Sequence, residues 1–200
     1  MEKTQEKLKM TASVLAGGLS RRMGTNKALI PMDGETIIAR AVRVLKGAFD
    51  EVNIIANDPL LYEGLDVRVY SDIIKEAGSL GGVYTALFHA KHDHVFVTAC
   101  DMPFLDMAVV RKVASAIDAF DAAVPFIGGR LHPMHAVYSK RCLKTIEAMI
   151  KEGNLRITEL FGRIKTQRLT EERFQGMDAE RSVENVNTKE ELERLLGSRR

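Results

Sequence analysis

Short runs of apolar and β-branched residues alternate along the chain with longer segments whose apolar residues recur at the spacing of an α-helix. Runs of this kind are typical of strands that helices cover on both faces. We therefore expect strands at 12–15, 52–56, 67–70, 95–99 and 122–126. Strands that alternate with helical segments predict βαβ units on a mostly parallel sheet, so the fold class is α/β.

Segment 35–49 shows the helical pattern most clearly, because its apolar residues form one stripe and its basic residues face away. The stripe consists of Ile37, Ile38, Ala41, Val42 and Leu45, and the opposite face carries Arg40, Arg43 and Lys46. Similar stripes predict helices over 80–90 and 109–120.

The pattern changes after residue 126. Gly128 and Gly129 predict a tight hairpin turn, and the alternating residues that follow predict antiparallel strands at the edge of the sheet, which makes the sheet mixed. Further helices are expected at 140–152 and 156–161, and a short strand at 165–169. Thr188 and Glu191 have the spacing of a capping box and predict the start of a last helix.

Composition and charge add limits to this picture. The 200 residues show no repeat or linker, so we expect one domain over 11–200 after a frayed, charged leader at 1–10. A formal net charge of +2 favours neither nucleic acid nor a membrane as partner, and no apolar stretch approaches the roughly 18 residues that span a bilayer. Cys100 and Cys142 lack the spacing of zinc ligands or of a disulfide framework, which fits a reducing cytoplasm.

Residues 13–27, SVLAGGLSRRMGTNK, place two adjacent glycines at the end of the first strand, with basic residues behind them. The phosphate-loop patterns GxxxxGK[ST] and GxGxxG are both absent. Gly17 and Gly18 nevertheless lack a Cβ, so a flat base or a ribose can approach the backbone there, while Arg22 and Lys27 supply charge for phosphates. The alternative is an ordinary glycine turn whose basic residues lie in water.

The same stretch resembles the LAGGxSxRMGxxK signature of the molybdenum cofactor guanylyltransferases, from Leu15-Ala16-Gly17-Gly18 through Ser20 and Arg22-Met23-Gly24 to Lys27. Further segments agree in the same order: SDII at 71–74, GSLGGVYTAL at 78–87, CDMPFL at 100–105, RLHPMHAVYS at 130–139 and VNTKEEL at 186–192. The resemblance covers nearly the whole chain after residue 11. It implies a Rossmann-like, three-layer nucleotidyltransferase fold with a mostly parallel mixed sheet.

Two aspartates follow predicted strands, where open α/β sheets bind their ligands. Asp101 follows the most apolar strand, VFVTA, and a single carboxylate there suffices for Mg²⁺ when substrate phosphates and water complete the shell. Asp72 follows VRVY in the same way. Each could instead be a cap or turn residue. The resemblance implies that Asp101 holds Mg²⁺ and that Asp72 lies in the nucleotide site.

The resemblance also implies the reaction, which is transfer of GMP from GTP to the terminal phosphate of molybdopterin, with or without molybdenum, and release of pyrophosphate. Arg22, Lys27 and Asp101 would be catalytic, while Leu15 to Gly18 would present backbone to the guanosine. Positioning and charge neutralisation suffice for such a transfer, without a protein nucleophile.

In the family that this chain resembles, asparagines at the positions of Asn185 and Asn187 border the active site on its pterin side; the alternative is that both are turn or cap residues. The resemblance also implies transient contacts with proteins that insert molybdenum or receive the cofactor. Two alternatives remain open. One is a cytidylyltransferase or a sugar-phosphate nucleotidyltransferase, and the other is a non-catalytic GTP-binding sensor. Three residues differ from those common in the family, namely Asn26, Ser79 and Ile55. Some relatives contact the nucleotide through an asparagine at position 55, and this role is not transferred to Asn57, the nearest asparagine here.

The five histidines complete the candidate polar residues. His89, His92 and His94 are expected in a solvated turn rather than in a metal site, because they span a helix end and a strand start. His132 and His135 lie either near the pterin side, as the resemblance implies, or as polar residues on an edge strand.

Overall fold

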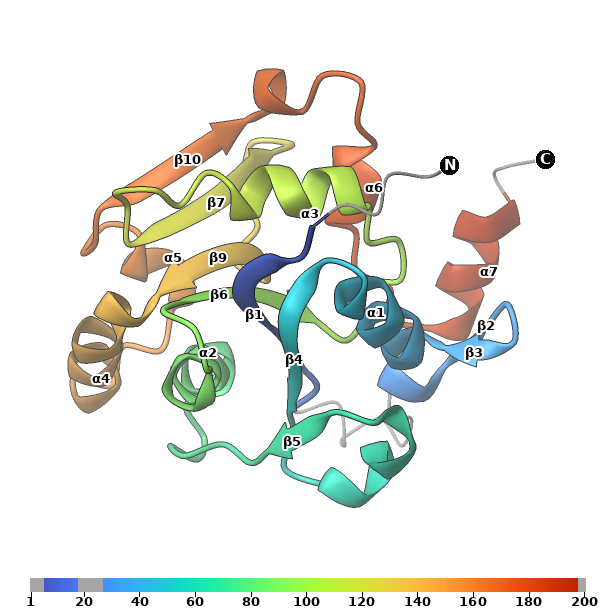
Figure 1. Ribbon diagram of the computed structural model, residues 1–200, viewed down its shortest axis with the longest axis horizontal. Helices are drawn as coiled ribbons and strands as arrows, with labels where there is room; N and C mark the ends of the chain where they lie inside the picture. Colours follow the sequence, from blue (N-terminus) through green and yellow to red (C-terminus); the bar gives the residue numbers. More distant parts are fainter. Residues whose placement is uncertain (1–5, 18–26, 198–200) are drawn as a thin grey trace.

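The computed structural model describes residues 6–17 and 27–197, which form a central sheet between two layers of helices (Figure 1). The strands are β1 Leu8–Leu15, β2 Pro31–Met32, β3 Glu35–Thr36, β4 Phe49–Ile55, β5 Arg68–Tyr70, β6 His94–Ala99, β7 Ala122–Ile127, β8 Arg130–Leu131, β9 His135–Ser139 and β10 Thr166–Thr170. The α-helices are α1 Ile37–Lys46, α2 Gly78–His89, α3 Met107–Ala114, α4 Leu143–Lys151, α5 Ile157–Leu160, α6 Ala179–Ser182 and α7 Lys189–Gly197. Short 3₁₀ helices lie at Lys27–Leu29, Pro59–Leu65, Lys140–Cys142 and Glu171–Phe174.

The sheet built by the described residues has eight strands in the order β10-β7-β9-β6-β1-β4-β5, and β8 pairs with β7. The central strand β1 is parallel to both neighbours, β4 and β6. β9 is antiparallel to β6 and β7, so β6 and β7 run in the same direction. The predicted mostly parallel mixed sheet is confirmed. The carboxyl ends of β1, β4, β5, β6 and β7 consequently meet at one edge, which we call the carboxyl rim.

β9 lies inside the sheet, and the prediction of an edge position for it was wrong. The turn itself was predicted correctly, because Gly128 and Gly129 have φ angles of 58° and 71° and join β7 to β8 in a hairpin. β8 ends after two residues, and the chain then inserts β9 between β7 and β6. All five residues of β9 are buried, since helices cover both of its faces.

Alternate residues of the strands enter two separate cores. One core packs α1 and α3 against residues such as Val14, Ile54 and Phe96. The other packs α2 and α4 against residues such as Ile55 and Val97. Figure 1 shows the two pairs of helices on opposite faces of the sheet. Each fully buried large apolar side chain contributes about 1.5–3 kcal/mol, so the two cores together hold the carboxyl rim rigid.

β1 begins at Leu8, inside the segment that the sequence pattern assigned to a frayed leader. The Leu8 amide donates a hydrogen bond of 2.7 Å to the carbonyl of Ala48, and Leu8 and Met10 pack against the core under α1 and α3. Residues 8–10 therefore belong to the sheet. The helix predicted over 109–120 is shorter, because α3 ends at Ala114 and Ser115 caps it.

The last helix, α7, packs against the β2–β3 hairpin, which the sequence pattern did not predict. A small apolar cluster joins them, formed by Ile30, Met32, Ile37, Val186 and Leu192. This packing brings residues 186–188 next to the 3₁₀ helix that begins at Lys27. Two segments that are far apart in the sequence thereby meet at the carboxyl rim.

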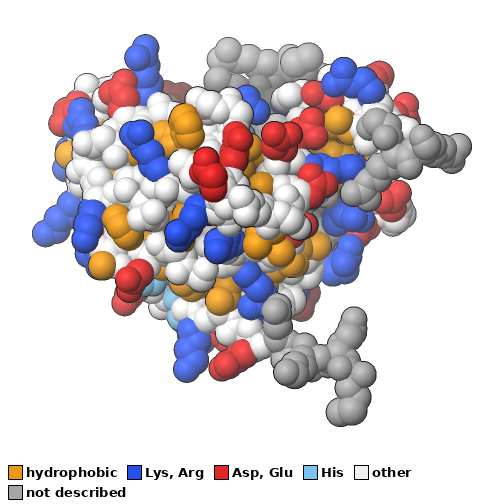
Figure 2. Space-filling view, turned by 90° about the horizontal axis from the view of Figure 1, so that it is seen from above, with side chains coloured by type: hydrophobic (Ala, Val, Ile, Leu, Met, Phe, Trp, Pro, Cys, Tyr) orange, Lys and Arg blue, Asp and Glu red, His pale blue; other side chains and the backbone are white. Residues whose placement is uncertain are grey.

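Positive and negative side chains are interspersed over the face seen from above in Figure 2, in keeping with the small net charge. Within residues 6–17 and 27–197, none of the helices combines the length and the apolar character needed to cross a membrane.

Candidate active site

The candidate site lies on the carboxyl rim, where Ala16 and Gly17 follow β1. The Ala16 amide donates to the carbonyl of Ile55 at 2.9 Å, and this bond carries the pairing of β1 and β4 one residue past the strand. A Cβ on Gly17 would stand 3.4 Å from Asp72 Oδ2 and 3.8 Å from Asn57 Nδ2. A Cβ at this position would touch the two side chains only at ordinary van der Waals distance, so the Gly17 backbone lies directly beside Asp72 and Asn57.

Asp72 follows β5 and is held by Asn57, which follows β4. Asn57 Nδ2 donates to Asp72 Oδ2 at 2.7 Å, and the Asp72 amide donates to Asn57 Oδ1 at 3.2 Å. Lys75 Nζ also donates to Asn57 Oδ1, at 2.7 Å. Asn57 lies on this rim, although the sequence reasoning considered it and did not transfer the family's nucleotide contact to it. The available signal was its position two residues past a strand end, the same placement that selected Asp72 and Asp101.

Lys27 and Asn187 are in direct contact, as Lys27 Nζ donates to Asn187 Oδ1 at 2.7 Å. The neighbouring Val186 amide donates to the backbone carbonyl of Asp101 at 2.8 Å. The structure therefore brings together three of the residues selected from the sequence, Lys27, Asp101 and Asn187. Asn185 is exposed on the same loop, and within the described residues no hydrogen bond links its side chain to this group.

Asp101 is half-buried just beyond the end of β6. Among the described residues its Oδ1 has no hydrogen-bond partner, although that atom is buried. Burial raises the pKa of this carboxyl above its ordinary value, the positive charge of Lys27 opposes the rise, and the negative charge of Glu191 adds to it. A buried carboxylate oxygen without a donor is suited to a metal ion, because a dication compensates the lost hydration.

The described residues around Asp101 include no further set of metal ligands. The described residues contain no cluster of three or more His, Cys, Asp or Glu side chains placed to hold a metal. Within the described residues Asp101 would thus need further ligands to hold a cation, which a substrate or water can supply. Burial raises the pKa of the neighbouring Cys100 thiol to about 12, so Cys100 stays protonated and is a poor nucleophile.

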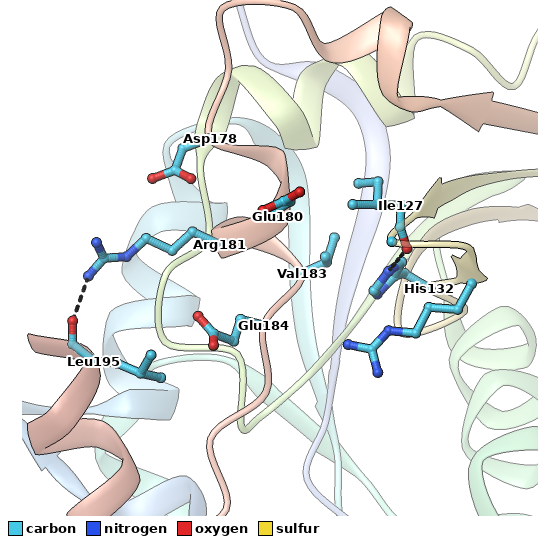
Figure 3. Close-up of a pocket in the computed structure, with 10 residues that line it drawn as sticks. Ile127, His132, Asp178, Glu180, Arg181, Val183, Glu184 and Leu195 are labelled. Atoms are coloured by element: carbon cyan, nitrogen blue, oxygen red, sulfur yellow. Dashed lines mark hydrogen bonds between the residues drawn. The ribbon is translucent and has the colours of Figure 1, made fainter. Parts of the chain in front are cut away.

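A cavity of about 670 Å³ opens on the same edge of the sheet, between the β7–β8 hairpin and helices α6 and α7 (Figure 3). Its lining is Ile127, Gly128, Arg130, His132, Asp178, Glu180, Arg181, Val183, Glu184 and Leu195. Residues 183–187 connect this cavity to the contact between Lys27 and Asn187. Only His132 and Gly128 among the lining residues could be selected individually from the sequence, because the cavity is formed by segments distant in the chain.

His132 and His135 have different surroundings. His132 lines the cavity, and its Nε2 donates to the carbonyl of Ile127 at 3.1 Å. His135 is fully buried in β9, with its ring edge-on to Phe96, so the expectation of a polar residue on an edge strand was wrong. Both of its ring nitrogens lack a partner among the described residues, and burial lowers its pKa to about 3.

Of the other residues selected from the sequence, some lie within the described part of the chain and some do not. Leu15 ends β1 and is buried against Gly82 of α2, so only its backbone can face a ligand. Gly18 and Arg22 lie outside the described residues. Of the three histidines near residue 90, His89 stacks on Tyr70 at 4.1 Å, His92 Nε2 lies 2.8 Å from Asp50 Oδ2, and His94 begins β6.

Comparisons with known proteins agree with this geometry. A family model described as the MobA-like NTP transferase domain matches residues 12–167. The molybdenum cofactor guanylyltransferase of Desulfosudis oleivorans is 38% identical over 188 residues, covering 92% of this chain and 93% of that protein. The probable molybdenum cofactor guanylyltransferase of Pelotomaculum thermopropionicum is 36% identical over 186 residues, covering 92% of this chain and 91% of that protein.

A solved structure is similar to this chain in its fold as well as in its sequence. The crystal structure of molybdopterin-guanine dinucleotide biosynthesis protein A from Archaeoglobus fulgidus has a TM-score of 0.80 at 25% identity. The likeness covers 96% of this chain and 100% of that one. The two-layer packing of helices on a mixed sheet is thus shared along essentially the full length of both chains.

Proposed function

The chain belongs to the MobA-like NTP transferase family, and on that basis we propose that it transfers GMP from GTP to the terminal phosphate of molybdopterin. It is a nucleotidyltransferase of molybdenum cofactor biosynthesis, so the type of reaction is known. The nucleotide, the metal and the acceptor are proposed from the residues of the site. The observation that carries the proposal is the meeting of Lys27, Asn187 and Asp101 on the carboxyl rim, where Gly17 and Asp72 also lie.

The nucleotide half of the site is proposed to lie over β1, β4 and β5. Leu15, Ala16 and Gly17 are proposed to offer backbone to the guanosine, together with Gly18, which lies outside the described residues. The Asp72 carboxylate lies beside Gly17, and Asn57 holds both this carboxylate and the Asp72 amide. A carboxylate can accept hydrogen bonds from ribose hydroxyls or from the N–H groups of a guanine edge. Ribose hydroxyls are common to all nucleotides, so the choice of GTP depends on the likeness to the guanylyltransferases.

The phosphate half of the site is proposed to lie between Lys27, Arg22 and Asp101. The acceptor phosphate attacks the α-phosphorus, a new P–O bond forms, the bond to the β-phosphate breaks, and pyrophosphate leaves. Lys27 and Arg22 neutralise charge that develops on the α-phosphate and on pyrophosphate. No covalent enzyme intermediate is needed.

A magnesium ion fits Asp101, since this carboxylate has a buried oxygen without a donor among the described residues. When bound, the ion would supply a positive charge that draws the phosphates together and polarises them. Asp101 itself would hold the ion, and Lys27 nearby would keep the pKa of the carboxyl from rising further.

The acceptor is proposed to approach the phosphates from the side away from Gly17 and Asp72, along residues 183–187 and the cavity beside His132. Asn187 borders this approach, and Asn185 lies on the same loop. Arg130 and Arg181 offer positive charge to a phosphate, while Glu184 offers an acceptor to the N–H groups of a pterin. The reaction would take place in the cytoplasm, and contacts with proteins that insert molybdenum or receive the cofactor would be transient.

The proposal is tested by incubating the protein with molybdopterin, Mg²⁺ and each of GTP, CTP, ATP and UTP, and measuring pyrophosphate. We expect release that requires both GTP and the acceptor. Equal release with CTP would support a cytidylyltransferase instead. GTP binding without pyrophosphate release, under conditions where the acceptor is intact, would contradict the proposed reaction and support a sensor.

A further inference from the structure

The capping box of α7 has an unusual connection. In an ordinary capping box the side chain three residues after the cap accepts a hydrogen bond from the backbone N–H of the cap residue itself. Here the Glu191 amide donates to Thr188 Oγ1 at 3.1 Å, which is the expected half. The Glu191 carboxylate, however, accepts from the backbone N–H of Asn187 at 2.8 Å, one residue before the cap.

This shift of one residue connects the helix to the active site. Asn187 is the residue whose side chain accepts from Lys27, and its predecessor Val186 donates to the backbone carbonyl of Asp101. Val186 and Leu192 are buried in the cluster that docks α7 on the β2–β3 hairpin. The loop at 186–188 is therefore anchored by the apolar cluster on one side and by Glu191 on the other.

We propose that Glu191 is a positioning residue for nucleotidyl transfer, which fixes the backbone of Asn187 so that its side-chain oxygen holds the Lys27 ammonium at a set place relative to Asp101. The inference rests on the proposed function, because it assigns Lys27 a role at the phosphates. A lysine side chain carries about 2 kcal/mol of rotamer entropy, so a fixed acceptor at its tip decides how much of the time the ammonium is correctly placed.

Helix stability alone does not explain the position of this carboxylate. Thr188 already caps α7 through its hydroxyl. The Glu191 carboxylate stands near Asp101, a second acidic group, and like charges repel each other. The Glu191 carboxylate therefore contributes a hydrogen bond to the Asn187 amide in addition to the cap made by Thr188. The side chain of the same Asn187 accepts from Lys27.

Three substitutions separate the two roles. Glu191→Ala removes the acceptor for the Asn187 amide. Glu191→Gln keeps an acceptor oxygen of nearly the same shape and removes only the charge. Thr188→Ala removes the cap hydroxyl and leaves the Glu191 carboxylate in place, so it is the control for a loss of helix stability.

Two readouts are needed. The first is the kcat and the KM for GTP in the pyrophosphate-release assay with molybdopterin and Mg²⁺, together with the melting temperature. The second is the ¹⁵N resonance of the Lys27 Nζ in protein labelled on lysine, assigned with Lys27→Arg, because this signal reports the hydrogen bond to Asn187 without any turnover.

We expect Glu191→Ala to lower kcat about tenfold with the KM for GTP within about threefold, because misplacement of a catalytic group affects the transition state more than binding. The Lys27 signal should move toward that of a solvent-exposed lysine. Glu191→Gln should restore kcat to within about threefold and keep the signal. Thr188→Ala should lower the melting temperature by a few degrees with kcat within about twofold.

The inference is overturned if Glu191→Ala leaves kcat and the Lys27 resonance at the parental values, or if its kcat falls no further than that of Thr188→Ala at equal melting temperature. It is also overturned if Glu191→Gln is as impaired as Glu191→Ala. If the parent releases no pyrophosphate from any nucleotide, the proposed function fails. An unchanged Lys27 resonance in Glu191→Ala refutes the positioning role of Glu191, whatever the outcome of the pyrophosphate assay.

Discussion

Replacement of Lys27 by alanine tests the phosphate half of the site most simply. In the structure the Lys27 ammonium is hydrogen-bonded to Asn187 at 2.7 Å in an exposed position. An exposed bond of this kind contributes at most about 1 kcal/mol to stability. The variant should therefore fold, with a melting temperature close to that of the parent.

The effect on turnover should be much larger. An ammonium about 4 Å from a phosphate oxygen contributes about 4 kcal/mol at an effective dielectric constant of 20, before the cost of desolvation. If about 3 kcal/mol of this acts in the transition state, kcat/KM falls roughly 150-fold, since each 1.4 kcal/mol is about a factor of ten. Removal of Lys27 also takes away the charge that opposes the rise in the pKa of Asp101, so the residual activity should need more Mg²⁺.

The assay is pyrophosphate release from GTP with molybdopterin at several Mg²⁺ concentrations, with a thermal melt of each protein. Lys91→Ala is the matched control, because Lys91 also forms one exposed contact, a 3.1 Å ion pair with Asp50, at the opposite edge of the sheet. Lys91→Ala should transfer at the parental rate. A Lys27→Ala variant that is folded and keeps more than about half of the parental kcat/KM would refute the assignment of Lys27 to the phosphates.

Three further predictions follow from the rim and the core. Asp101→Asn should lower turnover at least about 100-fold and abolish its dependence on Mg²⁺. The stability of the variant should equal or exceed that of the parent, because a buried charge is removed. Calorimetric Mg²⁺ binding as tight as in the parent would contradict this prediction. Asn57→Ala should raise the KM for GTP about tenfold with kcat within about threefold, because Asp72 loses both hydrogen bonds that hold it; an unchanged KM would contradict it. His135→Leu should be more stable than the parent in urea unfolding, by a margin that grows by roughly 2 kcal/mol from pH 7 to pH 5. The pKa of His135 is lowered to about 3, so below about pH 6.5 this residue binds more protons in the unfolded chain than in the folded one, and only the parent loses this contribution to stability as the pH falls. Parallel stability curves of the parent and His135→Leu would contradict the burial of a neutral imidazole.

The strand ends were predictable from the sequence because they follow from a general rule. Apolar runs locate the parallel strands, and ligands of open α/β sheets bind past the carboxyl ends of such strands. Asp72 and Asp101 were selected in this way, and both lie on the carboxyl rim. The glycine pair was selected by the same reasoning, and Gly17 lies on this rim beside Asp72 and Asn57.

The long-range contacts were not predictable by pattern alone. The bond between Lys27 and Asn187 joins residues 160 positions apart, and only the packing of α7 on an unpredicted hairpin brings them together. Asn57 reaches Asp72 because β4 and β5 are neighbours in register, which periodicity does not specify. β9 was misplaced because alternating residues suggest one exposed face, whereas small and aromatic side chains here fill cores on both faces.

The placement of one triphosphate between Lys27 and Asp101 is tested most directly by a crystal structure of the protein with GTP and Mn²⁺, located by its anomalous signal. We predict the guanosine over Gly17 beside Asp72, the phosphates within hydrogen-bond distance of Lys27, and the ion on Asp101. Nucleotide density away from the ends of β1 and β6, with no anomalous peak at the Asp101 carboxylate, would contradict the account.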